Sequence, residues 1–122
     1  MEDTLRQSLQ NVETDVDGAL ERFSGDEALY ESLLQAFLTD PTMEMLQDAI
    51  SRQAWDDAFT AAHALKGLAG NMGFVPLFHA MGELVIYIRT AKIKDVKDSL
   101  NQSLRCYKDL VCAIRQGNPV AM

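Results

Sequence analysis

Hydrophobic residues recur at helical spacing along most of the chain, in segments that polar, glycine or proline residues interrupt. Leu77, Met81 and Leu84 illustrate the spacing in one of these segments. The pattern predicts four long amphipathic helices, over about residues 27–53, 55–72, 75–91 and 95–115. Two shorter helices are expected ahead of them, over residues 4–13 and 16–23.

The breaks between the segments carry residues that start or stop helices. Asp26 and Asp95 are expected to cap the helices that follow them, and Pro41 should kink or split the segment in which it lies. Gly73 can end one helix and Pro76 suits the first turn of the next, which predicts a tight hairpin between them.

Long amphipathic helices joined by short connections pack best as an antiparallel bundle. The expected fold is therefore all-α: an antiparallel four-helix bundle with one or two short N-terminal helices that cover one end. We expect a single domain over residues 1–122, with a bundle core of about 27–115, N-terminal helices within 4–23 and a flexible tail over 117–122.

Composition supports helix and excludes some partners. The 122 residues include only 7 Gly and 3 Pro, and 48% of them are hydrophobic, which is enough for one core. The 11 basic and 18 acidic residues give a net charge of -7, which would repel a nucleic-acid backbone. No stretch approaches the roughly 20 apolar residues that span a bilayer, so we expect a cytoplasmic protein without membrane contact.

The segment 55–72 carries the candidate chemistry. Ala58, Leu65 and Met72 lie on its apolar side, and a helical wheel places His63 on the opposite side, facing solvent in mid-helix. That polar side comprises Asp56, Phe59, Thr60, His63, Lys66, Gly67 and Gly70. Each glycine costs a helix roughly 1 kcal/mol relative to alanine, which indicates a steric reason: close helix packing, or room for a partner beside the imidazole.

The run from His63 to Gly73, HALKGLAGNMG, resembles the signature of histidine-containing phosphotransfer (HPt) domains of two-component phosphorelays. The resemblance implies a helical bundle in which Nε2 of His63 is phosphorylated. It gives Lys66 a phosphoryl-stabilising role and Gly67 a role in steric clearance, which the position of Gly70 on the same face extends to that glycine. Some family members place a polar residue near the imidazole Nδ1, where this chain has Val85, so the orienting partner of the ring is unassigned.

The implied partners are the receiver domain of a response regulator, whose aspartate exchanges the phosphoryl group, and a histidine kinase, which can be a hybrid kinase. Mg²⁺ is expected only in the receiver, so the chain itself should need no cofactor or metal ligand, and we expect a monomer. The chain shows no nucleotide-binding or kinase motif, so it should be a phosphoryl carrier and not an enzyme that uses ATP.

Apolar residues near the histidine leave two interpretations open: they belong to the margin of the core, or they form a docking surface for a receiver domain. These residues are Phe59, Phe74, Phe78 and Val85. An alternative function is a non-catalytic helical adaptor that binds a signalling partner through the same face. A metal- or redox-active bundle is disfavoured, because the two histidines and two cysteines lack ligand spacing.

Overall fold

A computed structural model describes residues 1–117, which contain helices and no strand. The short N-terminal helices are α1 (Asp3–Asn11) and α2 (Val16–Arg22). They are followed by α3 (Glu27–Leu38), α4 (Thr42–Ser51), α5 (Trp55–Met72), α6 (Val75–Arg89) and α7 (Ile93–Gly117). The all-α fold is confirmed, with the expected first long helix divided into α3 and α4.

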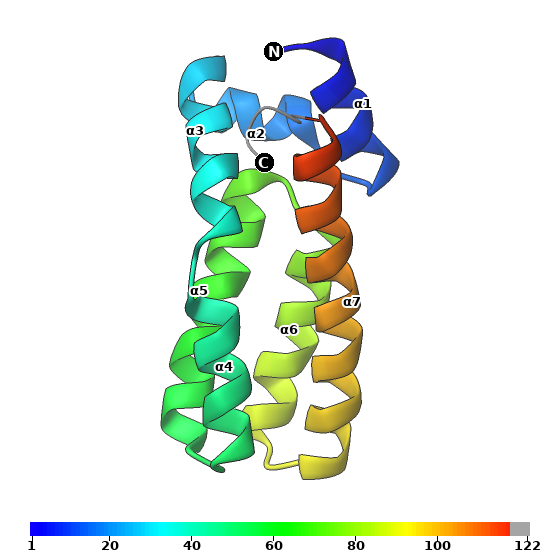
Figure 1. The fold of residues 1–122 in the computed structure, drawn as a ribbon. Coiled ribbons are helices and arrows are strands. Elements are labelled where there is room, and N and C mark those ends of the chain that lie inside the picture. Colours follow the sequence, from blue (N-terminus) through cyan, green and yellow to red (C-terminus); the bar gives the residue numbers. More distant parts are fainter. Residues whose placement is uncertain (118–122) are drawn as a thin grey trace.

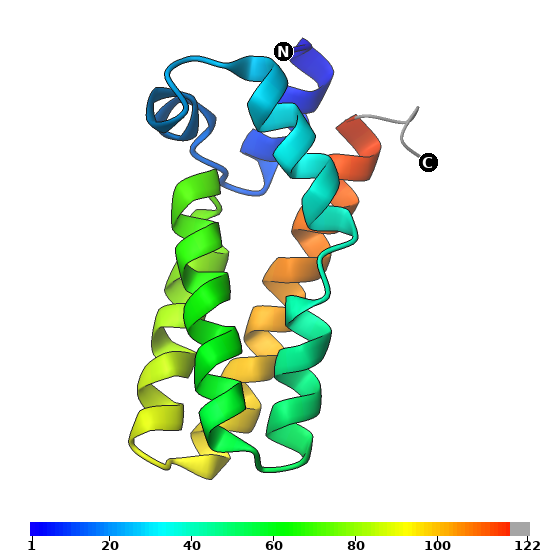
Figure 2. The same ribbon diagram turned by 90° about the vertical axis from the view of Figure 1, so that its left-hand side faces the viewer.

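Helices α4, α5, α6 and α7 run along a common axis with neighbours antiparallel (Figures 1 and 2). Helix α5 packs between α4 and α6, and α6 also packs against α7. Helix α3 continues the line of α4 beyond the bundle, while α2 lies across the end where α5 turns into α6 and α1 packs beside the C-terminal end of α7 (Figure 1). This is the four-helix bundle with N-terminal helices at one end that the hydrophobic pattern predicts.

Local sequence accounts for most of the helix ends. The side chain of Asp26 accepts a hydrogen bond of 3.0 Å from the backbone N–H of Leu29 and caps α3 as expected. Pro41 precedes the first residue of α4 and splits the segment. Gly73 ends α5 at a φ of 76°, in the left-handed region that glycine adopts without strain.

Two expected boundaries are wrong. Helix α7 begins at Ile93, so Asp95 lies in its first turn and is not its N-cap. Gly117 is the last residue of α7 and is buried, and a Cβ there would lie 2.7 Å from Cα of Leu5. Packing against α1 thus extends α7 through Gly117, where a flexible tail was expected. The rest of that expected tail, 118–122, lies outside the described residues.

Residues from α2, its N-cap and α3 hold the end of α5 in place. Three consecutive backbone carbonyls at the α5 terminus accept hydrogen bonds from Arg22 Nε at 3.1 Å, the Tyr30 hydroxyl at 2.8 Å and the Asp15 N–H at 2.8 Å. The acceptors are the carbonyls of Asn71, Met72 and Gly73, respectively. Carbonyls at a helix C-terminus lack partners within the helix, so these contacts satisfy them and fix the α5–α6 turn.

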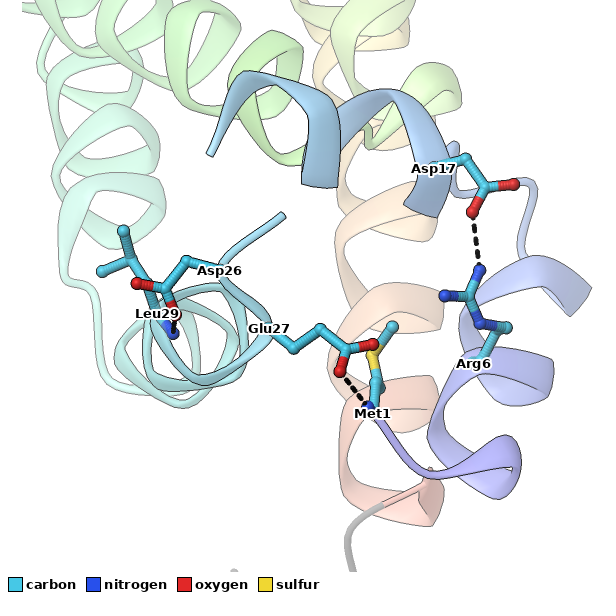
Figure 3. A network of polar contacts seen from close by, with 6 residues as sticks. All are labelled: Met1, Arg6, Asp17, Asp26, Glu27 and Leu29. Carbon is cyan, nitrogen blue, oxygen red and sulfur yellow. Dashed lines mark hydrogen bonds and ion pairs between the residues drawn. The ribbon is translucent and has the colours of Figure 1, made fainter. Parts of the chain in front are cut away.

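Ion pairs also connect the helices at this end (Figure 3). Arg6 of α1 pairs with Asp17 of α2 at 2.8 Å, and the amino group of Met1 pairs with Glu27 of α3 at 2.8 Å. The hydrogen bond and positive charge of that amino group lower the pKa of Glu27. The carboxylate of each pair is exposed to solvent, and ion pairs with an exposed partner add little stability, so the buried contacts of the N-terminal helices matter more.

The core runs through the whole length of the bundle. Leu34, Leu46, Leu65 and Leu84 are fully buried in it, one each from α3, α4, α5 and α6. Leu9 and Ile114 extend the same cluster to α1 and α7. Within residues 1–117, no helix is both long and apolar enough to cross a membrane.

Candidate functional site

His63 lies near the middle of α5 and is exposed. The opposite side of α5 is buried by small and aliphatic residues, which sit at helical spacing: Ala58, Ala61, Ala62, Leu65, Ala69 and Met72. Burial of that stripe fixes the rotation of the helix about its axis, so the imidazole faces solvent as the helical wheel predicts.

The ring of His63 stacks on the ring of Phe59, one turn earlier in α5. Their centroids are 5.9 Å apart, and their planes differ by 5°. Among residues 1–117, no side-chain hydrogen bond involves the imidazole. The sequence left open which residue contacts and orients the His63 ring. In the structure, the aromatic residue that contacts the ring is Phe59.

Lys66 extends from α5 across to α6. A Cβ added at Gly82 would lie 3.7 Å from Lys66 Cε, and Lys66 Nζ lies 5.6 Å from the centroid of the Phe78 ring. The ammonium group thus rests over an aromatic face of the neighbouring helix, in a cation–π contact. No sequence pattern marks Gly82, because only the pairing of the two helices shows that it makes room for the lysine stem.

The two glycines of the polar face differ in their surroundings. A Cβ at Gly67 would meet no atom within 4 Å, so the surface beside His63 is open there. A Cβ at Gly70 would lie 3.2 Å from two ring carbons of Phe78. The expectation that Gly70 provides clearance for a partner is therefore wrong: Gly70 makes room for the Phe78 side chain within the protein itself.

The expected docking residues also divide into two groups. Phe59 and Phe78 are half-buried: Phe59 stacks on His63, and Phe78 lies against Lys66. Phe74 is fully buried, with its ring centroid 5.0 Å from that of Phe37, and Val85 is 8% exposed within the core cluster. Phe74 and Val85 are thus wrong as docking residues, because the packing of α6 against its neighbours turns both inward.

Two pairs of a cation and an aromatic ring cross between α5 and α6 at this site. Lys66 of α5 lies over Phe78 of α6, and Arg89 of α6 lies with its Cζ 5.8 Å from the centroid of Phe59 of α5. No sequence pattern indicates Arg89, which reaches Phe59 only because the two helices are antiparallel. Both cations thus rest on aromatic rings of the α5–α6 pair, in a protein whose net charge is -7.

Within the described residues, no three side chains of the types His, Cys, Asp or Glu gather as potential metal ligands. The candidate site consists of the exposed imidazole of His63, the ammonium group of Lys66 three residues later on α5, the open surface at Gly67 and the stacked ring of Phe59. A neutral imidazole nitrogen so placed can accept a group from a second protein that approaches along the surface.

Comparison with known families gives one match. A family model described as "Hpt domain" matches residues 1–117, which is nearly the whole chain. No curated protein and no solved structure matches the sequence.

Proposed function

The chain belongs to the Hpt domain family of histidine phosphotransfer modules, and from that premise we propose that its phosphorylated residue is His63. In this proposal His63 exchanges a phosphoryl group with the aspartate of response-regulator receiver domains. The observation that carries the proposal is the exposed His63 in mid-helix, with Lys66 and the unobstructed Gly67 beside it. As an Hpt domain, the chain is a carrier module and not a classical enzyme.

The step that we assign to His63 is an in-line displacement at phosphorus. The electron pair of Nε2 forms a bond to phosphorus, and the bond from phosphorus to the receiver aspartate breaks, with its electron pair leaving on the carboxylate. Nδ1 keeps its proton during this step, so the ring gains positive charge. Attack by a receiver carboxylate on the phosphohistidine reverses the step and restores the neutral imidazole.

Lys66 and Gly67 have separate roles in this proposal. Because Lys66 is three residues from His63 on the same helix, its ammonium group can leave Phe78 and contact a phosphoryl oxygen. Gly67 keeps the approach free, so that a receiver can bring its aspartyl phosphate within about 3–3.5 Å of the imidazole nitrogen. The Mg²⁺ ion belongs to the receiver domain in this scheme, and a histidine kinase lies upstream.

The test is incubation of the purified chain with phosphorylated receiver domains. The chain should acquire a phosphoryl group that is labile in acid and stable in base, and His63→Gln should abolish its transfer. His79→Gln removes the second histidine of the chain and should transfer normally. Labelling that survives His63→Gln would refute the assignment. If the chain binds a receiver but never becomes labelled, it acts as a non-catalytic adaptor instead.

A further inference from the structure

The imidazole of His63 has an aromatic neighbour where a hydrogen-bond partner could be expected. Val85 of α6, which stands where some family members have a polar residue, is buried in the core and has no polar group. We propose that Phe59 is a positioning residue for phosphoryl transfer, which orders the His63 ring by stacking. This inference rests on the proposed role of His63 and adds a residue to it.

The geometry of the pair supports an ordering role. Residues four apart on a helix lie on the same face, one turn from each other. At a centroid separation of 5.9 Å and an interplanar angle of 5°, the two rings are in an offset parallel arrangement, which is favourable for aromatic pairs. A parallel contact restricts rotation of the imidazole plane and so limits the directions in which its nitrogen lone pairs point.

Phe59 is itself held, which a positioning residue requires. Its side chain is half-buried and packs against the core cluster. On the α6 side, the guanidinium carbon of Arg89 lies 5.8 Å from the Phe59 centroid, within the range of a cation–π contact. The phenyl ring is thus held by the core and contacted by a second helix, whereas the imidazole makes no side-chain hydrogen bond within residues 1–117 and stacks on Phe59.

Besides ordering the His63 ring, Phe59 should stabilise the charge that develops on this ring during phosphoryl transfer. When Nε2 bonds to phosphorus while Nδ1 keeps its proton, positive charge develops on the imidazole. The face of an aromatic ring attracts a cation, so Phe59 stabilises the ring more strongly in the transition state than in the neutral ground state. Loss of the phenyl ring should therefore slow transfer, even where partner binding is unchanged.

Phe59 could instead act only as a contact for the receiver domain, and the experiment separates the two roles. Wild type, Phe59→Leu and Phe59→Tyr are compared with two donors: a phosphorylated receiver, and inorganic phosphoramidate, which releases ammonia and needs no docking surface. Affinity for the unphosphorylated receiver is measured separately. Thermal unfolding followed by circular dichroism shows that each variant is folded.

We expect Phe59→Leu to lower the rate with both donors by about two- to five-fold, with little change in receiver affinity. Phe59→Tyr keeps the ring and should stay near the wild-type rates. In NMR spectra, the ring current of Phe59 should shift the His63 ring protons upfield in wild type and Phe59→Tyr but not in Phe59→Leu. His79→Gln assigns the signals, because it leaves only one histidine.

Wild-type rates in Phe59→Leu with phosphoramidate would overturn the proposal, and so would a change in receiver affinity alone. Upfield signals that persist in Phe59→Leu would show that another group orders the ring, which also overturns it. If neither donor labels the wild-type chain, the proposed function itself fails, a result distinct from the others because the NMR shift is independent of transfer.

Discussion

Replacement of Gly67 by alanine should make the protein more stable and at the same time a slower phosphoryl carrier. Gly67 lies inside α5 on its exposed side, and a Cβ there would have no atom within 4 Å. The methyl group therefore adds no clash, while alanine is a better helix former than glycine by about 0.8–1 kcal/mol. We expect the free energy of unfolding to rise by nearly that amount.

The gain is measurable by standard unfolding experiments. For a chain of this size, about 1 kcal/mol corresponds to a rise in Tm of about 3–5 °C, or to a shift of about 0.5 M in the urea midpoint at unchanged slope. Gly70→Ala is the matched control, since it makes the same change on the same helix. Its Cβ would lie 3.2 Å from the Phe78 ring, so the gain in helix propensity should be cancelled or reversed.

Gly67→Ala should also lower the rate of phosphoryl transfer from a phosphorylated receiver. The Gly67→Ala methyl group lies one turn from the imidazole, on the surface along which we propose that the receiver approaches. A displacement of the reacting groups by less than 1 Å would slow transfer by about ten-fold, and Gly67→Leu should slow it further. A variant that is more stable and transfers at the wild-type rate would refute the access argument. A Gly67→Ala variant that is less stable than wild type would refute the conclusion that a Cβ at this position meets no other atom.

Further predictions concern the contacts around the site. Tyr30→Phe should lower the free energy of unfolding by about 1–2 kcal/mol in urea titrations, because the buried Met72 carbonyl loses its hydrogen bond. Burial raises the pKa of Tyr30, so the unfolded chain ionises first as the pH rises above about 10. Stability should therefore fall with rising pH in that range, and it should fall less steeply in Tyr30→Phe; equal slopes would contradict this. Asp26→Ala should cost about 1 kcal/mol in the same assay through loss of the α3 cap, and no loss would show that the cap is dispensable. Lys66→Ala should slow transfer or shorten the phosphohistidine lifetime at nearly unchanged Tm, whereas unchanged kinetics would remove Lys66 from the site.

The positions of the helices could be predicted from the sequence, because helix formation leaves local signals. Periodic apolar residues, the Asp26 cap, the Pro41 break and the Gly73 terminus act within one or two turns, and all four have the predicted effect. Asp95 shows the limit of such signals: an acidic residue stabilises the first turn of a helix as well as its cap, so the sequence pattern did not distinguish the two positions.

The surroundings of individual side chains depended on which helices pair. Gly67 and Gly70 carry the same signal in the sequence, yet one faces open space and the other the Phe78 ring of α6. For Phe74 and Val85, the sequence left two interpretations open, the margin of the core and a docking surface. Their burial follows from contacts with other helices, which a wheel does not include.

The sequence by itself determined the all-α fold, the exposed position of His63 and, through its signature, the family. These depend on residues that are close in the chain, or on a motif that can be read directly. Only the tertiary structure decided that Gly82 makes room for Lys66, that Arg89 reaches Phe59, and that Tyr30 secures the end of α5. Each joins residues from different helices, and the distance between such residues is set by the packing of the whole bundle.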